Sequence, residues 1–171
     1  MVHHVLETDR LILRKLEPED AELILDLLNQ PSYLQFIGDK EVRTLDDARR
    51  YILQGPMASY ECFGFGLYLT LLREGDVPIG ICGLVKRDTL PDVDIGFAFL
   101  PQFWSKGYAV ESASAVLAYG RSVVGLKRIV AITTLDNRGS IRVLERIGLR
   151  FERRVRLTED EPELNLFSSE A

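Results

Sequence analysis

The segment that decides the fold is FAFLPQFWSKGYAVESASAVLAYG, which runs from Phe97 to Gly120. It begins as an apolar strand, breaks at Pro101, passes through a tight turn that contains Lys106 and Gly107, and continues as a helix. A turn of this kind directs several backbone N–H groups and the positive end of the helix dipole at one point. The segment therefore predicts an anion-binding site at the start of a helix.

The neighbouring segments complete a strand–helix–strand unit around this turn. Strands are expected over residues 92–100 and 127–135, and the helix over residues 107–124. We expect the two strands to be parallel and the crossover to be right-handed. Ligands of open α/β sheets bind at the carboxyl ends of parallel strands. In this chain that end is the turn over residues 101–109.

The rest of the chain alternates strands and helices, which gives the overall order β-α-α-β-β-β-α-β-α-β-β. Pro18 begins the first helix, Pro31 ends it, and residues 31–43 are expected to be irregular. Thr44 and Asp47 have the spacing of a capping box. The other expected elements are strands at 10–16, 63–72, 77–87, 150–157 and 163–169, and helices at 45–55 and 137–148, with turns at 73–76 and 158–162.

Length and composition indicate one domain over residues 1–171 that needs no metal. Its formal net charge of −5 argues against nucleic acid as the main partner. No apolar run is long enough for a membrane span, and the N-terminus lacks the features of a signal peptide, so the cytoplasm is the expected location. Cys62 and Cys82 are too few for a metal site, and His3 and His4 lie too near the chain end to complete one.

Three phosphate-binding turns compete for the segment after Pro101. The P-loop pattern G-x-x-x-x-G-K-[ST] and the dinucleotide pattern G-x-G-x-x-G are both absent from the sequence. The third, [Q/R]-x-x-G-x-[G/A], holds the pyrophosphate of coenzyme A in the GNAT acyltransferase superfamily. WSKGYA resembles it at Gly107 and Ala109, with Trp104 in the place of Gln or Arg.

Longer segments extend this resemblance over nearly the whole chain. GFAFLPQFWSKGYAVESA resembles the pattern G-Y-x-L-x-P-x-x-W-G-K-G-Y-A-T-E-A of the branch that includes the ribosomal-protein alanine/serine N-acetyltransferases (RimJ/RimL-like). LDNRGSIRVLERIGLRFE resembles the N-x-x-S-x-x-x-L-E-K-x-G-F-x-x-E segment of that branch. LETDRLILRKLEPEDAE resembles its T-x-R-L-x-L-R-x-x-x-x-x-D opening.

The resemblance implies both a fold and an activity. The fold is α/β, of the GNAT type, with a mixed, mostly antiparallel sheet, a central parallel pair and about four helices. The activity is transfer of an acetyl group from acetyl-CoA to a primary amine by direct attack, with a protein N-terminal α-amino group as one acceptor. A non-catalytic acyl-CoA sensor and a polyamine or antibiotic acetyltransferase stay open as alternatives, and so does a homodimer.

The same resemblance assigns residues to coenzyme A. Gly107 lets the pyrophosphate approach the backbone because it has no side chain, and Ala109 keeps the next position small. Lys106 either meets a phosphate or is solvated, and Trp104 is expected to pack beneath the turn. Glu111 is expected to cap the helix or bond locally. The full set expected at the cofactor is Phe97, Phe99, Leu100, Trp104, Ser105, Lys106, Gly107, Tyr108, Ala109, Val110, Asn137 and Ser140.

The resemblance also implies that the strand over residues 92–100 carries the pantetheine arm along its splayed carboxyl end. A backbone N–H near Phe99 is then available to stabilise charge on the thioester oxygen. Strand alternation puts Phe97 and Phe99 on one face and Ala98 and Leu100 on the other.

The catalytic residues are assigned partly by what is missing. Many GNAT enzymes have a tyrosine acid seven residues after Asn137, but this chain has Leu144 there, so resemblance makes Ser140 the substitute proton donor. Asn137 serves as a helix N-cap, as a pantetheine contact, or as both. Asp94 is the candidate base, and a solvated acid at a strand edge is the alternative interpretation.

The acidic turn with Glu159, Asp160 and Glu161 either lies over the acceptor or is only an exposed turn. We expect an acceptor that carries an α-amino group or an extended cationic amine and enters from the side of residues 31–43 and 158–162.

Overall fold

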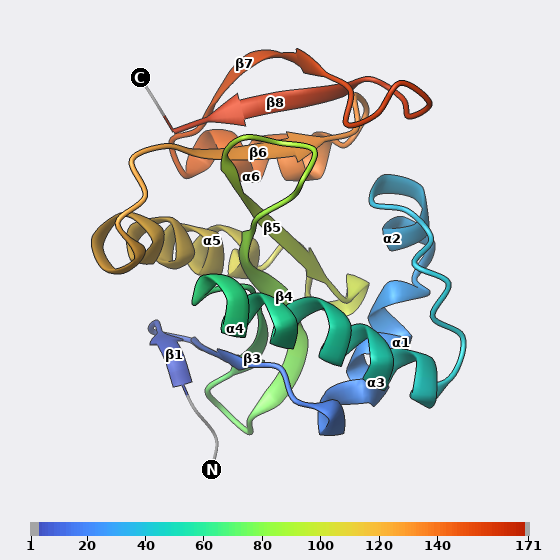
Figure 1. Cartoon of the computed structure of the whole chain (residues 1–171). Helices are drawn as coiled ribbons and strands as arrows, with labels where there is room; N and C mark the ends of the chain where they lie inside the picture. Colours follow the sequence, from blue (N-terminus) through green and yellow to red (C-terminus); the bar gives the residue numbers. More distant parts are fainter. Residues whose placement is uncertain (1–3, 170–171) are drawn as a thin grey trace.

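An eight-stranded sheet runs through the protein and carries helices on both faces (Figure 1). The structure is a computed structural model that describes residues 4–169. The strands lie in the order β1-β2-β3-β4-β5-β6-β8-β7, and every neighbouring pair is antiparallel except β5 and β6. Their bounds are β1 His4–Glu7, β2 Leu11–Lys15, β3 Leu67–Leu72, β4 Val77–Val85, β5 Val93–Phe99, β6 Ile129–Thr133, β7 Arg150–Val155 and β8 Leu164–Ser168.

The helices divide between the two faces of this sheet. One apolar core joins the sheet to α1 Ala21–Leu28, α2 Pro31–Phe36 and α3 Leu45–Ile52. The other core joins it to α5 Tyr108–Tyr119 and α6 Arg138–Arg146, with Tyr60 of α4 Ala58–Phe63. Within residues 4–169, no helix combines the length and the hydropathy that crossing a bilayer requires.

The strand–helix–strand unit expected from the sequence is confirmed. β5 and β6 are parallel, and α5 connects them with its C-terminal extension, the π-helical turn Gly120–Val124. The mixed, mostly antiparallel sheet with one parallel pair agrees with the architecture that the resemblance implies.

The pairing between β5 and β6 is short, and this shapes the centre of the molecule. Only Val93 pairs with Ile129, and Asp94 with Val130, before the two strands separate. Residues 96–98 of β5 are half-buried although the strand lies in the middle of the sheet. The separation therefore leaves a gap beside the carboxyl half of β5.

The expectation that residues 31–43 are irregular is confirmed for residues 37–43 but is wrong for residues 31–36, which form α2. Pro31 is the first helical residue, where its missing N–H costs nothing, and Gln30 before it is extended with ψ 140°. Pro31 thus begins a helix immediately after ending one.

Two further boundaries differ from the expectation. The helix expected at 45–55 continues through the π-helical turn Leu53–Met57, which accommodates Pro56, and through α4 to Gly64. The strand expected from Phe63 therefore begins only at Leu67. The sequence analysis also missed β1, in which His4 lies with its Nδ1 2.8 Å from a carboxylate oxygen of Glu7. His3 lies outside the described residues.

Candidate active site

Two helices begin at the carboxyl edge of the parallel pair, one on each side of the gap. α5 follows the turn after β5, and α6 follows Asn137 after β6. α5 and α6 also contact each other. The fold therefore brings the two sets of sequence-predicted residues, 97–110 and 137–140, to one edge of the sheet.

The turn before α5 presents a run of backbone N–H groups without protein partners. Glu111 is the first residue whose N–H joins the helix, at 3.0 Å from the carbonyl of Gly107. Within residues 4–169, the N–H groups of residues 105–110 have no hydrogen-bond acceptor. Ser105 with φ +61° and Gly107 with φ +85° are both left-handed, which makes the turn concave. This geometry fits an anion held by several N–H groups.

The backbone of β5 presents further polar groups to the gap. The N–H of Leu100 donates to Ile79 of β4 at 2.9 Å, so the alternate residues Phe97 and Phe99 direct their backbone groups away from β4, towards the gap. The rings of Phe97 and Phe99 lie on the α5 side, whereas Ala98 and Leu100 pack on the opposite face, as expected. The N–H of Phe99 thus faces the gap at the end of the strand.

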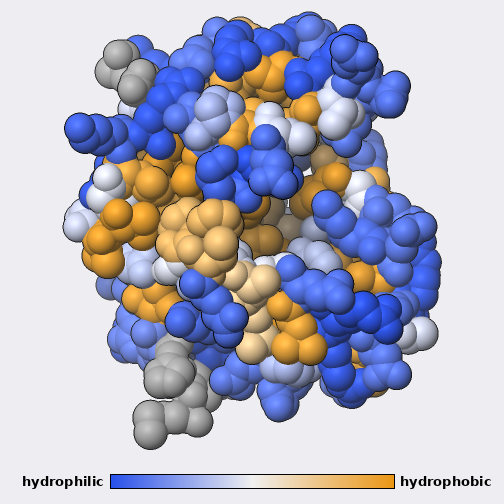
Figure 2. Space-filling view, viewed as in Figure 1, coloured by the Kyte–Doolittle hydropathy of each residue, from blue (hydrophilic) through white to orange (hydrophobic). Residues whose placement is uncertain are grey.

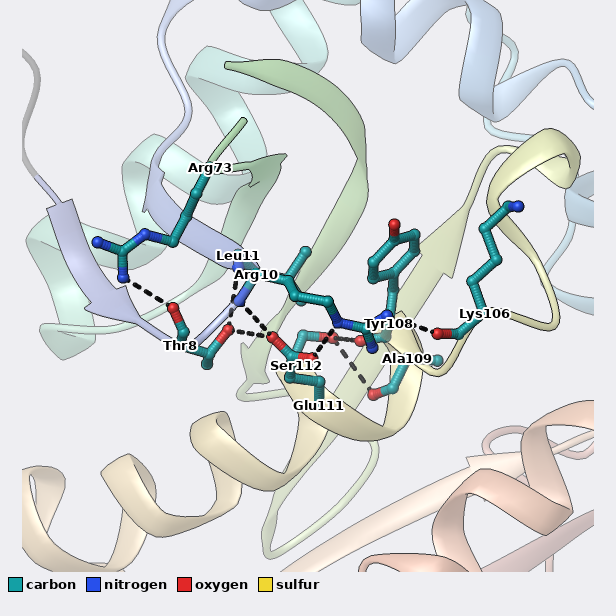
Figure 3. A network of polar contacts seen from close by, with 9 residues as sticks. All are labelled: Thr8, Arg10, Leu11, Arg73, Lys106, Tyr108, Ala109, Glu111 and Ser112. Carbon is teal, nitrogen blue, oxygen red and sulfur yellow. Dashed lines mark hydrogen bonds and ion pairs between the residues drawn. The ribbon is translucent and has the colours of Figure 1, made fainter. Parts of the chain in front are cut away.

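Trp104 was expected to pack beneath the turn, but its side chain is 48% exposed. Its Nε1 donates to the carbonyl of Phe99 at 2.8 Å. The side chain therefore connects the turn to the end of β5. It also occupies the Phe99 carbonyl, which faces the gap. Lys106 is exposed, with its side chain directed away from the network in Figure 3.

A polar network behind the turn was missed by the sequence analysis (Figure 3). Glu111 does not bond locally but accepts from Thr8 Oγ1 at 2.5 Å and from the N–H and Nε of Arg10 at 3.0 and 2.7 Å. Partial burial acts to raise the pKa of Glu111, but these hydrogen bonds outweigh it and lower the pKa. The sequence signal for this network was Arg10, a charged residue in the segment that resembles the family opening.

On the other side of the gap, Asn137 caps α6 as expected. Its side chain accepts the N–H of Ser140 at 3.2 Å. Ser140 is half-buried in the first turn of α6. Leu144 is 1% exposed in the apolar core, so no acid occupies the position of the family tyrosine.

Asp94 is neither at an edge nor solvated, so the alternative interpretation is wrong. It lies on the central strand β5, is 1% exposed, and accepts from Arg87 Nε at 2.6 Å. Burial raises the pKa of Asp94, and the charge and hydrogen bond of Arg87 oppose that rise. Arg87 comes from the loop after β4 and is also missing from the sequence-based set.

The surface on the α2 side of this ion pair is hollowed. Figure 2 shows a hollow where Figure 1 has α2 facing β5, with hydrophilic residues on its rim. Arg87 acts electrostatically on Tyr33 of α2, on Tyr51 of α3 and on Lys40. Desolvation of the Lys40 ammonium and the like charge of Arg87 lower the pKa of Lys40.

Glu161 acts on Lys40 in the opposite direction. The two segments expected to flank the acceptor, 31–43 and 158–162, therefore lie near each other.

Comparison with known proteins identifies the class. A family model described as an acetyltransferase (GNAT) domain matches residues 10–150. The uncharacterized N-acetyltransferase YoaA of Bacillus subtilis is 31% identical over 150 residues, which cover 86% of this chain and 84% of YoaA. The chain belongs to the GNAT family and is an N-acetyltransferase.

Solved structures share its fold. An acetyltransferase from Agrobacterium tumefaciens matches with a TM-score of 0.83 and 25% identity, over 97% of this chain and 94% of that one. RimL, a ribosomal L7/L12 alpha-N-protein acetyltransferase solved in complex with coenzyme A, matches with a TM-score of 0.80 and 18% identity, over 97% of both chains. The RimJ/RimL-like resemblance is thus confirmed at the level of fold.

The ion pair between Arg87 and Asp94 yields a test of stability. The variant Arg87→Gln should lose about 2 kcal/mol at pH 7.5, because it leaves a buried carboxylate without its partner. This is less than the ~3–5 kcal/mol typical of removing one member of a buried pair, since the Arg87 side chain is 34% exposed. Thermal unfolding should show the melting temperature lower by roughly 4–8 °C.

The stability difference between Arg87→Gln and the wild type should shrink as the pH falls. Without Arg87, the pKa of Asp94 in the folded state lies further above its unfolded value, so the native state binds the proton more tightly and gains stability relative to the wild type in acid. In the double variant Arg87→Gln/Asp94→Asn this pH dependence should disappear. A deficit that is constant from pH 5 to pH 7.5 would show that Asp94 is not its source.

Proposed function

We propose that this enzyme transfers the acetyl group of acetyl-CoA to the α-amino group of a peptide or protein N-terminus. GNAT acetyltransferases use acetyl-CoA, and the single observation that carries the finer proposal is the gap beside β5. It has the anion-binding turn on one side and the hollow lined by α2 on the other. A donor and an acceptor can therefore reach the same strand from opposite faces.

The residues of the turn fit the donor. We assign its pyrophosphate to the N–H groups of residues 105–110, at the N-terminus of α5, where the helix dipole favours negative charge. When bound, acetyl-CoA supplies the thioester from which the acetyl group leaves. The backbone N–H and carbonyl of Phe97 in the gap are free to pair with the amides of the pantetheine arm. The carbonyl of Phe99 is held by Trp104, and its N–H is left for the thioester. Asn137 and Ser140 face the arm from the start of α6.

The chemistry asks three things of the protein. The N–H of Phe99 donates to the carbonyl oxygen as negative charge develops there, when the amine nitrogen bonds to the carbonyl carbon. Ser140 gives a proton to the departing sulfur as the C–S bond breaks and regains one from solvent. Asp94 takes the proton that the amine loses, through an intervening water because its carboxylate is 1% exposed. Its raised pKa makes it a better proton acceptor than an ordinary carboxylate.

The charges at the hollow favour an α-amino acceptor over a polyamine. Arg87 and Lys40 add two positive charges to the carboxylates of Asp94 and Glu161 on this side. An extended polycation would have to place a charge near one of these cations. An α-amino group needs less help from the protein, since its pKa of about 7.7–8.0 leaves roughly a tenth of it neutral at pH 7, against less than a thousandth of a lysine amine.

An amine panel tests the function. With acetyl-CoA at pH 7, peptides with a free α-amino group should release thiol and gain one acetyl group by mass spectrometry. The same peptides with a blocked N-terminus and a free lysine should not, and spermidine should react slowly. Tight binding of acetyl-CoA without turnover across the panel would favour the sensor, and a preference for spermidine would favour the small-amine alternative.

The placement of the pyrophosphate predicts an effect at Gly107. The variant Gly107→Glu should lose most of its affinity for coenzyme A in calorimetry, because it brings a negative charge to the turn and its Cβ would lie 3.1 Å from Arg10 Nη2, which distorts the turn from behind. Gly125→Glu is the matched control, since Gly125 has the same φ of +85° and open space around it, at the end of the π-helical turn after α5. Equal affinities for the two folded variants would overturn the placement.

The assigned proton transfers predict different pH signatures. Asp94→Asn should lower kcat/KM more at pH 6.5 than at pH 8.5, because only amine that is already neutral can then react. Ser140→Ala should slow the reaction a few-fold at every pH, since a thiol with a pKa of about 8.5 leaves readily without an acid. Asp92→Asn is the control, because Asp92 pairs with Arg128 at 3.0 Å. If kcat/KM falls by the same factor and with the same pH dependence in Asp94→Asn and Asp92→Asn, Asp94 is not the base.

A further inference from the structure

We infer that Arg10, just before β2, is a positioning residue of the anion-binding turn, which it holds with the Gly107 N–H directed at the ligand. The inference rests on the proposed placement of the coenzyme A pyrophosphate at residues 105–110. Arg10 touches the turn from outside and is assigned no contact with the ligand.

The side chain of Arg10 joins three parts of the turn and of α5 (Figure 3). Its Nε donates to Glu111 Oε1 at 2.7 Å, and its Nη1 donates to the carbonyl of Lys106 at 2.9 Å. Its guanidinium carbon lies 4.5 Å from the centre of the Tyr108 ring. The planar guanidinium can serve these contacts at once, because its donors point in fixed directions.

The bond to Lys106 determines where the next N–H points. In a planar trans peptide the carbonyl and the N–H of the same unit point in opposite directions, and the described chain has no cis peptide. Because Arg10 holds the carbonyl of Lys106, the N–H of Gly107 must point away from Arg10. On the proposed placement, that direction is the side on which the pyrophosphate binds.

This peptide needs holding, because the turn itself does not hold it. Glycine at 107 adopts many backbone conformations, so the peptide before it can rotate at little cost. The N–H groups on either side have no protein acceptor among the described residues. A turn that is already in its binding conformation loses less entropy on binding, and so binds more tightly.

Arg10 is in turn held by Glu111. That carboxylate accepts from Thr8 Oγ1 and from both the N–H and the Nε of Arg10, and Thr8 Oγ1 accepts the N–H of Leu11 at 3.1 Å. The side chain of Glu111 is 20% exposed, and its position in the first turn of α5 suits its charge. The segment before β2 is thereby fixed to the helix that carries the turn.

Calorimetry with three ligands tests this role. Arg10→Gln should weaken the binding of coenzyme A about tenfold, the order expected for losing a charged hydrogen bond. It should weaken 3′-dephospho-CoA by the same factor, because both carry the pyrophosphate. Pantetheine, which has no pyrophosphate, should bind as it does to the wild type.

Two variants serve as controls. Arg73→Gln removes a neighbouring arginine whose Nη1 donates to the carbonyl of Thr8 at 2.9 Å, and it should leave all three affinities unchanged. Arg10→Lys keeps the charge but cannot hold Lys106 and Glu111 together, so its loss should match that of Arg10→Gln. Recovery of affinity by lysine would show that charge alone matters and would overturn the inference.

The remaining outcomes are also decisive. A loss for coenzyme A but not for 3′-dephospho-CoA would make Arg10 a ligand of the 3′-phosphate, and an equal loss for all three ligands would make it a general structural residue. Either result overturns the positioning role, as does no loss at all. If Gly107→Glu abolishes binding and Arg10→Gln does not, only this inference fails. If Gly107→Glu binds normally, the proposed pyrophosphate placement itself fails.

Discussion

The separation of β5 from β6 after Asp94 is the constraint on which the rest of the structure depends. A central strand that loses its neighbour exposes backbone N–H and carbonyl groups, and such groups need partners. Here β4 satisfies one edge of β5, and Trp104 satisfies the carbonyl of Phe99 on the other. The polar groups that remain give a ligand a place to extend the sheet without disturbing the fold.

The two faces of the sheet have different electrostatic environments because different elements cover them. On the α5 face, the helix N-terminus and the concave turn favour an anion. On the opposite face, a buried carboxylate needs a cation, and Arg87 meets Asp94 where the strands begin to part. The gap therefore joins a site built from backbone dipoles to a site built from charged side chains.

Local sequence predicted well the elements whose signals are local. The turn between β5 and α5, the cap at Asn137 and the parallel pair follow from glycine, capping residues and apolar runs over a few positions. The wrong predictions of helix boundaries occur at proline, which can end a helix, begin one or be accommodated within one. Pro31 can end a helix or begin one, and Pro56 is tolerated because a π-helical turn accommodates it.

The sequence by itself determined the order of the elements from β3 onward, the strand–turn–helix unit and the resemblance that makes the chain a GNAT enzyme. Only the tertiary structure decided the partners of its charged groups. Glu111 bonds to Arg10, which lies 101 positions away, and Asp94 is buried against Arg87 instead of lying in solvent at an edge. The reason is that strand order and the packing of helices decide which side chains meet, and neither is encoded in the spacing of residues along the chain.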